Sequence, residues 1–243
     1  MPHTISESVR RALVFALVAA LGCGSGDLLL PDPPGGGTVA LTKVDGDAQV
    51  GTVGEALPSL LVVQVLSERQ QPVAGRVVEF ALTSDSAAGE VSPQTALTDD
   101  AGEAKARWVL GTSPGSHVVT ARIVDDTTSI DVAEFTATAK AAAPDTIAAL
   151  SAQSQTGRRN GKVDTQPLVR VVDRFGNPVR DVPVVWLVTA GEGRVEQPTT
   201  ITDAAGTAGA QWTLGNRLGL HHLTATVGGV TGSLVTFSAT VLF

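Results

Sequence analysis

One pattern of residues occurs twice in this chain of 243 residues, about a hundred positions apart. The segments TDDAGEAKARWVLG (98–111) and TDAAGTAGAQWTLG (202–215) share a Thr-Asp pair, a Gly three residues after the Asp, a Trp and a final Leu-Gly. The segments before them also align, 59–82 with 166–188. A repeat of this length exceeds a solenoid unit, so each copy is expected to fold as a domain of its own.

Apolar and polar residues alternate through both copies, which is typical of half-buried strands. In the second copy we expect Ala210, Trp212 and Leu214 on the inner face, and Gln211 and Thr213 on the outer one. No window after residue 37 has the three-to-four spacing of a helix. The sequence therefore predicts an all-β fold of two tandem Greek-key β-sandwiches of immunoglobulin type, without a buried disulfide.

The aromatic residues of both copies fall on inward positions of the alternating pattern. Large aromatic side chains contribute most to a core when they are buried there. The predicted core aromatic residues are Trp108, Trp186, Trp212, Phe80, Phe135 and Phe237.

The first residues have the pattern of a secretory signal. Arg10 and Arg11 precede the apolar run ALVFALVAAL, which is too short to span a bilayer, and Gly22 and Cys23 follow it. The stretch AALGC resembles the lipobox of bacterial lipoproteins, although Leu21 stands one position later than the usual Leu. The resemblance implies lipidation of Cys23 and a secreted lipoprotein at the outer membrane or cell surface, with secretion and a free thiol as the alternative.

The chain thus divides into five segments. Residues 1–22 are the signal peptide, and residues 23–37 are the lipidated Cys and a flexible tether rich in Gly and Pro. The first domain is expected at 38–140 and the second at 147–243. Residues 141–146 form a brief linker with one Pro, which favours a semi-rigid join.

The second copy resembles the group 1 bacterial Ig-like domain of intimins and invasins. It carries a D-x-x-G-N-P-V turn at 173–179, a T-D-x-x-G turn at 202–206 and a closing strand with Thr224 and Ala225. The first copy keeps Pro72 and Val73 of the first turn but lacks its Asp, Gly and Asn, so we expect a longer or differently shaped turn there. The resemblance implies a stalk in cell-surface adhesion.

The repeated motifs are interpreted as turns. An Asp side chain can bind the backbone two residues later, and Gly adopts the positive φ of a tight connection. The alternative is a cation site at Asp99, Asp100 and Glu103, but the second copy has a single carboxylate there and calcium needs several oxygen ligands. The predicted turn residues are Asp99, Gly102, Asp173, Gly176, Asn177, Pro178, Asp203 and Gly206.

Enzymatic function is not expected. GTSPG at 111–115 has the letters of a nucleophile elbow, but Pro114 cannot donate the backbone N–H that an oxyanion hole needs. His221 and His222 are adjacent and face opposite ways on a strand, so they cannot share a metal. No dinucleotide or phosphate-binding motif occurs, so no cofactor or metal is expected.

The formal net charge of −7 argues against nucleic acid as a partner. Arg158, Arg159 and Lys162 are interpreted as a solvated basic loop. We expect a non-catalytic surface lipoprotein that acts as a spacer or adhesion module, held to the membrane by its anchor and binding a protein or cell-surface partner. The alternatives are a carbohydrate or cell-wall binding module, which would need outward aromatic residues, and a rod stiffened by calcium.

Overall fold

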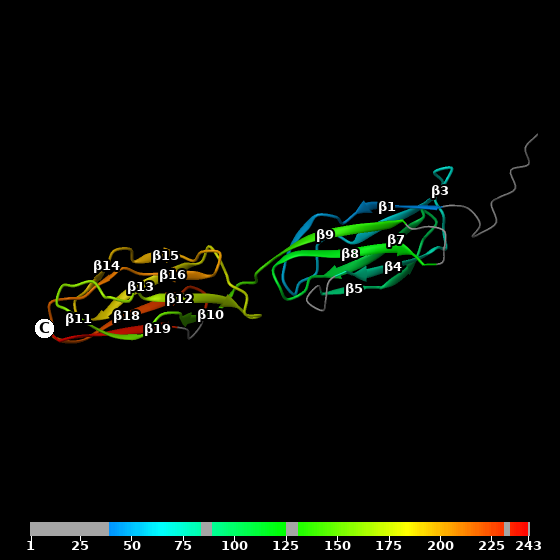
Figure 1. The fold of residues 1–243 in the computed structure, drawn as a ribbon. Coiled ribbons are helices and arrows are strands. Elements are labelled where there is room, and N and C mark those ends of the chain that lie inside the picture. Colours follow the sequence, from blue (N-terminus) through cyan, green and yellow to red (C-terminus); the bar gives the residue numbers. More distant parts are fainter. Residues whose placement is uncertain (1–38, 84–88, 125–130, 231–233, 243) are drawn as a thin grey trace, which may run out of the picture. The chain divides into compact units, whose positions relative to one another are not determined.

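The computed structural model describes residues 39–83, 89–124, 131–230 and 234–242. The signal segment and Cys23 lie outside the described residues. Every regular element in the described ranges is a β-strand, so the all-β prediction is confirmed (Figure 1). Within the described ranges no helix is long and apolar enough to cross a membrane.

The first copy forms one sandwich, hereafter the first sandwich. Its strands are β1 (Val39–Asp45), β2 (Gln49–Thr52), β3 (Leu61–Ser67), β4 (Val77–Leu82), β5 (Glu90–Ser92), β6 (Thr95–Leu97), β7 (Glu103–Val109), β8 (Gly115–Ile123) and β9 (Val132–Lys140). One sheet has the order β1-β3-β7-β5 and the other β2-β9-β8-β4-β6. The crossing connections between the sheets give the predicted Greek-key sandwich.

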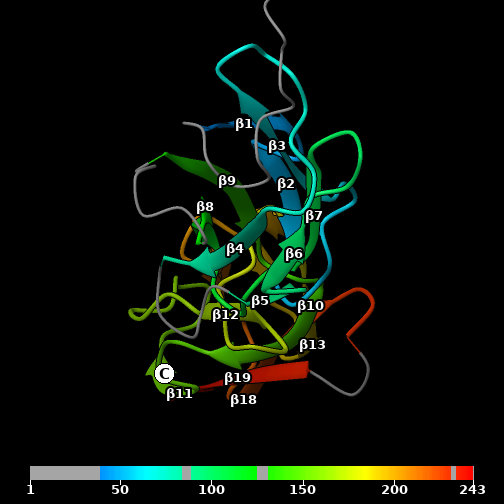
Figure 2. The same cartoon turned by 90° about the vertical axis from the view of Figure 1, so that its right-hand side faces the viewer.

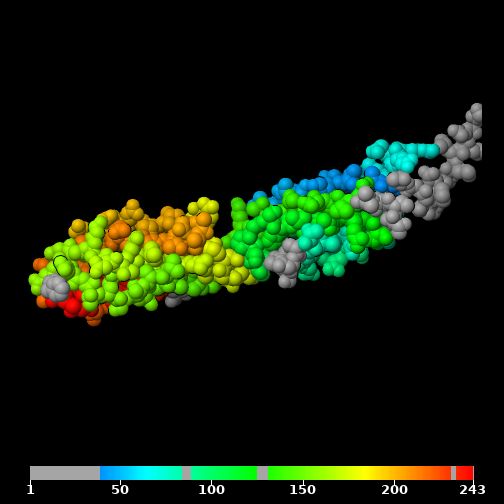
Figure 3. Space-filling model, viewed as in Figure 1, coloured from blue at the N-terminus to red at the C-terminus, as the bar shows by residue number. Residues whose placement is uncertain are grey.

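The second copy forms the second sandwich. Its strands are β10 (Pro144–Ala149), β11 (Ser154–Gly157), β12 (Leu168–Asp173), β13 (Pro183–Ala190), β14 (Arg194–Val195), β15 (Thr199–Ile201), β16 (Thr207–Gly209), β17 (Trp212–Thr213), β18 (Gly219–Val227) and β19 (Leu234–Val241). Five strands form a sheet in the order β11-β19-β18-β13-β15. The opposite layer consists of β10-β12-β16 and the pair β14-β17. On the face seen in Figure 3, yellow-green and yellow residues of this sandwich adjoin its orange residues, and β13 pairs with β15.

The two sandwiches differ at one strand. The first has a continuous β7, whereas the second divides the corresponding strand into β16 and β17. The period-two alternation continues across this break, since Ala210, Trp212 and Leu214 are buried and Gln211 is exposed, and Thr213 is buried as well. Thr213 thus lies between two residues that face the core, and it is buried because Arg194 and Lys162 from other segments pair with it.

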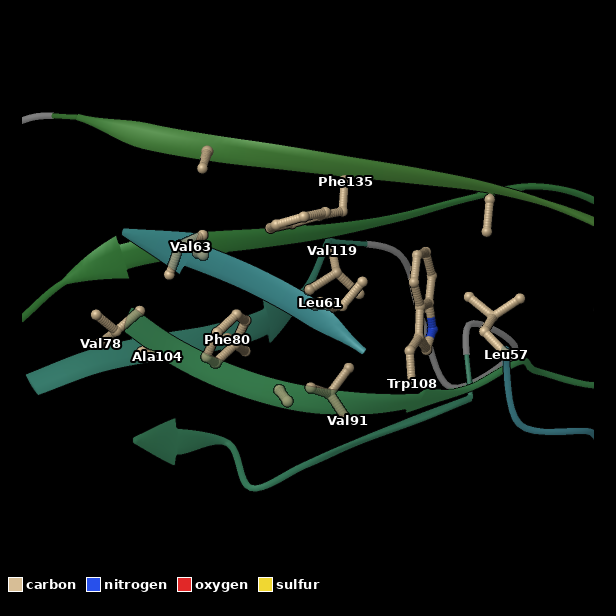
Figure 4. Packing of buried hydrophobic residues seen from close by; sticks show 14 of the residues in the cluster. Leu57, Leu61, Val63, Val78, Phe80, Val91, Ala104, Trp108, Val119 and Phe135 are labelled. Atoms are coloured by element: carbon tan, nitrogen blue, oxygen red, sulfur yellow. The ribbon is translucent and has the colours of Figure 1, made fainter. Parts of the chain in front are cut away.

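Each sandwich has its own hydrophobic core, and these cores hold the six predicted aromatic residues. In the first, Trp108 points between the two layers toward Leu57 and Leu61, while Phe80 and Phe135 approach from β4 and β9 (Figure 4). The second core contains the other three aromatic residues, Trp186, Trp212 and Phe237. All six aromatic side chains are at most 2% exposed, so each sandwich removes its aromatic area from water on its own.

The join between the sandwiches is short. Strand β9 ends at Lys140 and β10 begins at Pro144, so the three residues 141–143 lie outside strands. The sequence places the linker at 141–146, but residues 144–146 belong to β10. Pro is compatible with this position because it is tolerated at the first residue of a strand.

Candidate functional site

The T-D-x-x-G motifs form the same turn in both sandwiches. Asp99 Oδ1 accepts hydrogen bonds from the backbone N–H groups of Ala101 and Glu103, each at 2.9 Å. Asp203 Oδ1 accepts the corresponding bonds from Ala205 and Thr207, also at 2.9 Å. One carboxylate oxygen in each turn is thus committed to holding its own backbone.

The glycines of these turns are required by conformation and by space. Gly102 and Gly206 both have φ of +71°. A Cβ at Gly102 would lie 2.6 Å from the carbonyl oxygen of Val65, and one at Gly206 would lie 2.5 Å from that of Val171. The turns therefore pack directly on the backbone of the neighbouring strand, where no larger residue fits.

The Thr of each motif is a structural residue that the sequence reasoning missed. The hydroxyl of Thr98 donates to Val73 O at 2.7 Å and accepts from Arg76 N at 2.9 Å. Thr202 makes the same two contacts, with Val179 O at 2.8 Å and Val182 N at 2.9 Å. The signal that could have identified both residues is their recurrence immediately before the Asp in each copy.

Asp173, the carboxylate of the D-x-x-G-N-P-V turn, accepts four hydrogen bonds. Its Oδ1 accepts from the N–H groups of Phe175 and Asn177, each at 2.9 Å. Its Oδ2 accepts from Asn177 Nδ2 at 3.0 Å and from the N–H of Ala142 at 2.9 Å. Burial opposes the charged form, but these hydrogen bonds outweigh it and hold the pKa of Asp173 below its usual value.

The corresponding turn in the first sandwich has the same shape, so the expectation of a longer or different turn is wrong. Ser67 N donates to Gln71 O and Gln70 N to Ser67 O, both at 2.9 Å. Asp173, Gly176 and Asn177 make the matching backbone bonds at 2.9 and 3.0 Å. Gln70 adopts φ of +59° where the second copy has Gly176 at +83°. The strands flanking the turn impose this conformation, even on a residue that does not favour it.

Two further residues of the second turn contact the first sandwich. Asn177 Nδ2 donates to the backbone carbonyl of Thr112 at 2.8 Å. A Cβ added to Gly54 would lie 2.7 Å from Phe175 Cζ, so the ring lies against the backbone of that loop. Sequence reasoning assigned Asn177 to the turn alone and did not single out Phe175. Asp173, Phe175 and Asn177 thus form a polar and aromatic cluster beside residues 141–143.

Two of the three carboxylates of the alternative cation site, those of Asp99 and Glu103, contact Lys105. Lys105 Nζ lies 2.8 Å from Glu103 Oε2 and 3.9 Å from Asp99 Oδ2. Glu103 raises the pKa of this ammonium group, which therefore stays charged beside both carboxylates. Among the described residues no group of three or more His, Cys, Asp or Glu is placed to hold a metal ion. A resident cation here would have to compete with Lys105.

Ser113, the serine of the GTSPG segment, is contacted by His117 at its backbone carbonyl and not at its hydroxyl group. His117 Nε2 lies 2.8 Å from the backbone carbonyl of Ser113, and that contact supports the loop. His221 makes the matching contact in the second sandwich, with Nε2 2.9 Å from Arg217 O. Both histidines are buried, so their repeated role is to hold the loop that precedes β8 or β18.

The remaining candidate surfaces are exposed. Lys162 of the basic loop pairs with Glu196 at 2.6 Å, and both side chains are at least half exposed. A hollow of about 830 Å³ lies beside the second Thr-Asp bend, where Lys140, Arg180 and Asp181 line it with Ala204. Arg180 and Asp181 bind each other at 2.9 Å and are 69% and 73% exposed, so this is open surface with solvated charges.

Comparison with known proteins agrees with this geometry. Residues 147–240 match the model of the bacterial Ig-like domain (group 1). The match covers nearly the whole of the second sandwich. This confirms the resemblance predicted from its D-x-x-G-N-P-V and T-D-x-x-G turns. No curated protein matches the chain.

Solved structures of surface proteins are similar in fold. FdeC, an Escherichia coli adhesin, is 17% identical with a TM-score of 0.50, and the match covers 85% of this chain and 65% of FdeC. The D0-D1 domain of intimin is 20% identical with a TM-score of 0.34, covering 83% and 96%. InvD of Yersinia pseudotuberculosis is 16% identical with a TM-score of 0.47, covering 84% and 57%. This chain therefore spans less than two thirds of the FdeC and InvD chains that it matches.

Proposed function

We propose that this chain is a non-catalytic lipoprotein of the cell surface, whose two Ig-like sandwiches act as a spacer and a protein-interaction module. The observation that carries the proposal is the use of the repeated polar residues. Asp99, Asp173 and Asp203 direct their carboxylates to backbone N–H groups of their own turns. Residues committed in this way stabilise a scaffold and are not free to perform chemistry.

Two further observations support the proposal. The second sandwich matches the model of the bacterial Ig-like domain (group 1), and FdeC, which shares the fold, is an adhesin. The N-terminal segment has the pattern of a lipoprotein signal ending at Cys23. Two sandwiches with separate cores, joined by three residues outside strands, suit a spacer between a membrane and a partner.

The anchor is tested by metabolic labelling with a palmitate analogue. The native chain is expected to take up the label and to stay with the membrane fraction. The Cys23→Ala variant is expected to lose the label and to be released. An unlabelled native chain would remove the anchor from the proposal and leave secretion with a free thiol.

The interaction role is tested by attachment of cells that carry the native chain, with cells expressing Cys23→Ala as the control. The surfaces are immobilised serum and matrix proteins in one arm, and insoluble peptidoglycan and chitin in the other. We expect attachment to the protein surfaces alone. Attachment to the polysaccharides alone would instead support a carbohydrate-binding module. A carbohydrate-binding module needs exposed aromatic side chains. Among the described Trp and Phe residues, Phe175 alone is exposed, at 37%.

A further inference from the structure

The five-stranded sheet of the second sandwich has an outer face without charged side chains. The sequences of β11, β13, β15, β18 and β19 contain no Asp, Glu, Lys or Arg. Five outward aliphatic side chains are 46–62% exposed: Val185, Leu187, Ile201, Leu220 and Leu234. Most of the remaining outward positions are Thr or Ser, which present a methyl group or a small hydroxyl. We call this surface the uncharged face.

The first sandwich provides a like-for-like comparison, because its five-stranded sheet has the same register. One row of directly paired residues there is Thr95, Glu79, Arg122 and Val132. The matching row of the second sandwich is Thr199, Val185, Thr226 and Leu234. The ion pair between Glu79 and Arg122, with 2.5 Å between Oε2 and Nη2, is thus replaced by an uncharged pair.

In the next row of the two sheets, a charged residue of the first sandwich, Glu134, is again replaced by an uncharged one, Thr236. Ala81, Thr120 and Glu134 are paired across the first sheet, and Leu187, Thr224 and Thr236 across the second. Figure 2 shows β18 and β19, which carry Thr224 and Thr236, side by side in this sheet. The two sandwiches share a fold, so the sheet does not require an uncharged outer face. The uncharged outer face is therefore a property of this sheet's own residues, which makes it a candidate interface.

Two hydroxyl groups of the uncharged face donate hydrogen bonds to backbone carbonyl groups of the same sandwich. Thr224 Oγ1 donates to Leu187 O at 3.2 Å, and Ser238 Oγ donates to Gln153 O at 3.1 Å. A hydroxyl that already binds the backbone of its own sheet loses less on leaving water. The face can therefore be covered by another apolar surface at a low desolvation cost.

We infer that the uncharged face is a self-association surface, and that its occupant is the same face of a second copy of this chain. Each copy has a net charge of −7, so two copies repel each other wherever charged surfaces meet. A face free of charged side chains avoids this repulsion. Two identical flat faces are related by a twofold axis, which gives a closed dimer with aliphatic and Thr side chains packed between two sheets.

The area of the face is sufficient for such a dimer. The strands β11, β13, β15, β18 and β19 have 4, 8, 3, 9 and 8 residues. At about 3.4 Å per residue and 4.8 Å between strands, they cover roughly 520 Å² on each copy. The total of about 1,050 Å² reaches the roughly 1,000 Å² that a specific interface needs, at the small end of the range, where association is weak. The charged side chains nearest the face, such as Asp181 and Glu196, lie just outside its strands, as in the polar rim of an interface. The inference does not depend on the proposed function.

Sedimentation velocity tests the inference with the full chain carrying Cys23→Ala, which excludes a lipid and an intermolecular disulfide. Over about a hundredfold range of concentration, we expect a monomer–dimer equilibrium that added salt does not weaken. Leu234→Glu should raise the dissociation constant at least about tenfold, because it places a charge within the apolar interface of each copy. Val132→Glu, at the register-matched position of the first sandwich, should leave it unchanged.

A second variant keeps the test decisive if Leu234→Glu unfolds the protein. The double variant Val185→Glu/Thr226→Arg recreates the Glu79–Arg122 pair, which the same sheet accommodates in the first sandwich. At a concentration at which the parent chain is monomeric, it should melt at the temperature of the parent, and at higher concentrations it should still sediment as a monomer. A parent chain that stays monomeric throughout, a dimer that survives the double variant, or equal weakening by Val132→Glu would overturn the inference.

Discussion

The carboxylate of Asp173 binds the backbone of Ala142, with 2.9 Å between Oδ2 and N. The same carboxylate holds the turn that contains Phe175 and Asn177. A single side chain therefore connects the short join to the second sandwich. Because Asp173 is 2% exposed, water cannot replace these hydrogen bonds if the carboxylate is removed.

Replacing Asp173 by Ala is expected to lower the free energy of unfolding by about 3 kcal/mol, because buried N–H groups are left without acceptors. Urea denaturation followed by circular dichroism measures this loss. Hydrogen exchange should also become faster at the N–H of Ala142. Ser67→Ala is the matched control, because Ser67 accepts one bond of 3.3 Å in the equivalent turn, and its cost should be well below 1 kcal/mol. Equal costs for the two variants would contradict the role of Asp173.

Acid should weaken the protein through Asp173 and Asp47. Burial alone would raise the pKa of Asp47, but hydrogen bonds from Lys43, Thr136 and Ala48 lower it from 3.8 to about 2. A carboxyl with a depressed folded pKa stabilises the protein above its unfolded pKa, and this contribution is lost as the pH falls through the folded value. For Asp47 the loss therefore lies between about pH 4 and pH 2.

Urea denaturation at pH 7 and pH 3 measures this dependence. We expect the parent chain to lose stability between the two pH values, and Asp47→Asn and Asp173→Asn each to lose less, because an amide does not titrate. Glu196 is a suitable control. Lys162 lowers its pKa too, but both side chains are exposed, so Glu196→Gln should hardly change the pH dependence. An unchanged pH dependence in both Asn variants would refute the assignment.

Gln70 and Gly176 occupy equivalent turn positions at φ of +59° and +83°. A left-handed conformation costs a side-chain-bearing residue about 1–2 kcal/mol, whereas Gly loses about 0.5–1 kcal/mol more entropy on folding. Gln70→Gly should therefore stabilise the first sandwich by about 0.5–1 kcal/mol. Gly176→Gln should destabilise the second by a similar amount, because a Cβ there meets nothing within 4 Å. Thermal unfolding of both variants tests the pair, and shifts of the same sign would disprove the argument.

Much of this fold could be predicted from the sequence because it depends on local signals. Period-two alternation identifies strands, and the Thr-Asp and Gly spacing identifies turns, as in the bonds of Asp203 to its own backbone. Two copies in one chain also check each other. The resemblance to a bacterial Ig-like domain could be stated for the second copy because its turn residues are intact.

The errors and omissions concern contacts between residues far apart in the sequence. Thr202 binds the backbone 20 and 23 residues away, and no periodicity encodes that pairing. Thr213 is buried because Arg194 and Lys162, which lie far from it in the sequence, pair with it. The turn at Gln70 was misjudged because its conformation depends on the register of β1, β3 and β7 more than on its own residues.

Two glycines of the first sandwich, Gly75 and Gly102 of the T-D-x-x-G turn, allow conformational strain to be separated from steric overlap. Gly75 and Gly102 in the first sandwich have φ of +77° and +71°, but a Cβ at Gly75 meets nothing within 4 Å. Gly75→Ala should therefore cost about 1 kcal/mol from conformation alone. Gly102→Ala must also push Val65 O away from a distance of 2.6 Å, where Val65 N already binds Gly102 O.

We expect Gly102→Ala to cost at least about 3 kcal/mol, because β3 and the turn must separate and their hydrogen bonds weaken. Urea denaturation of both variants measures the difference. Gly206→Ala should repeat the large effect in the second sandwich, where Val171 O lies 2.5 Å from the added Cβ. Similar costs for Gly75→Ala and Gly102→Ala would mean that the turn moves freely away from the strand. In that case the conserved geometry of the two copies would rest on the Asp and Thr side chains alone.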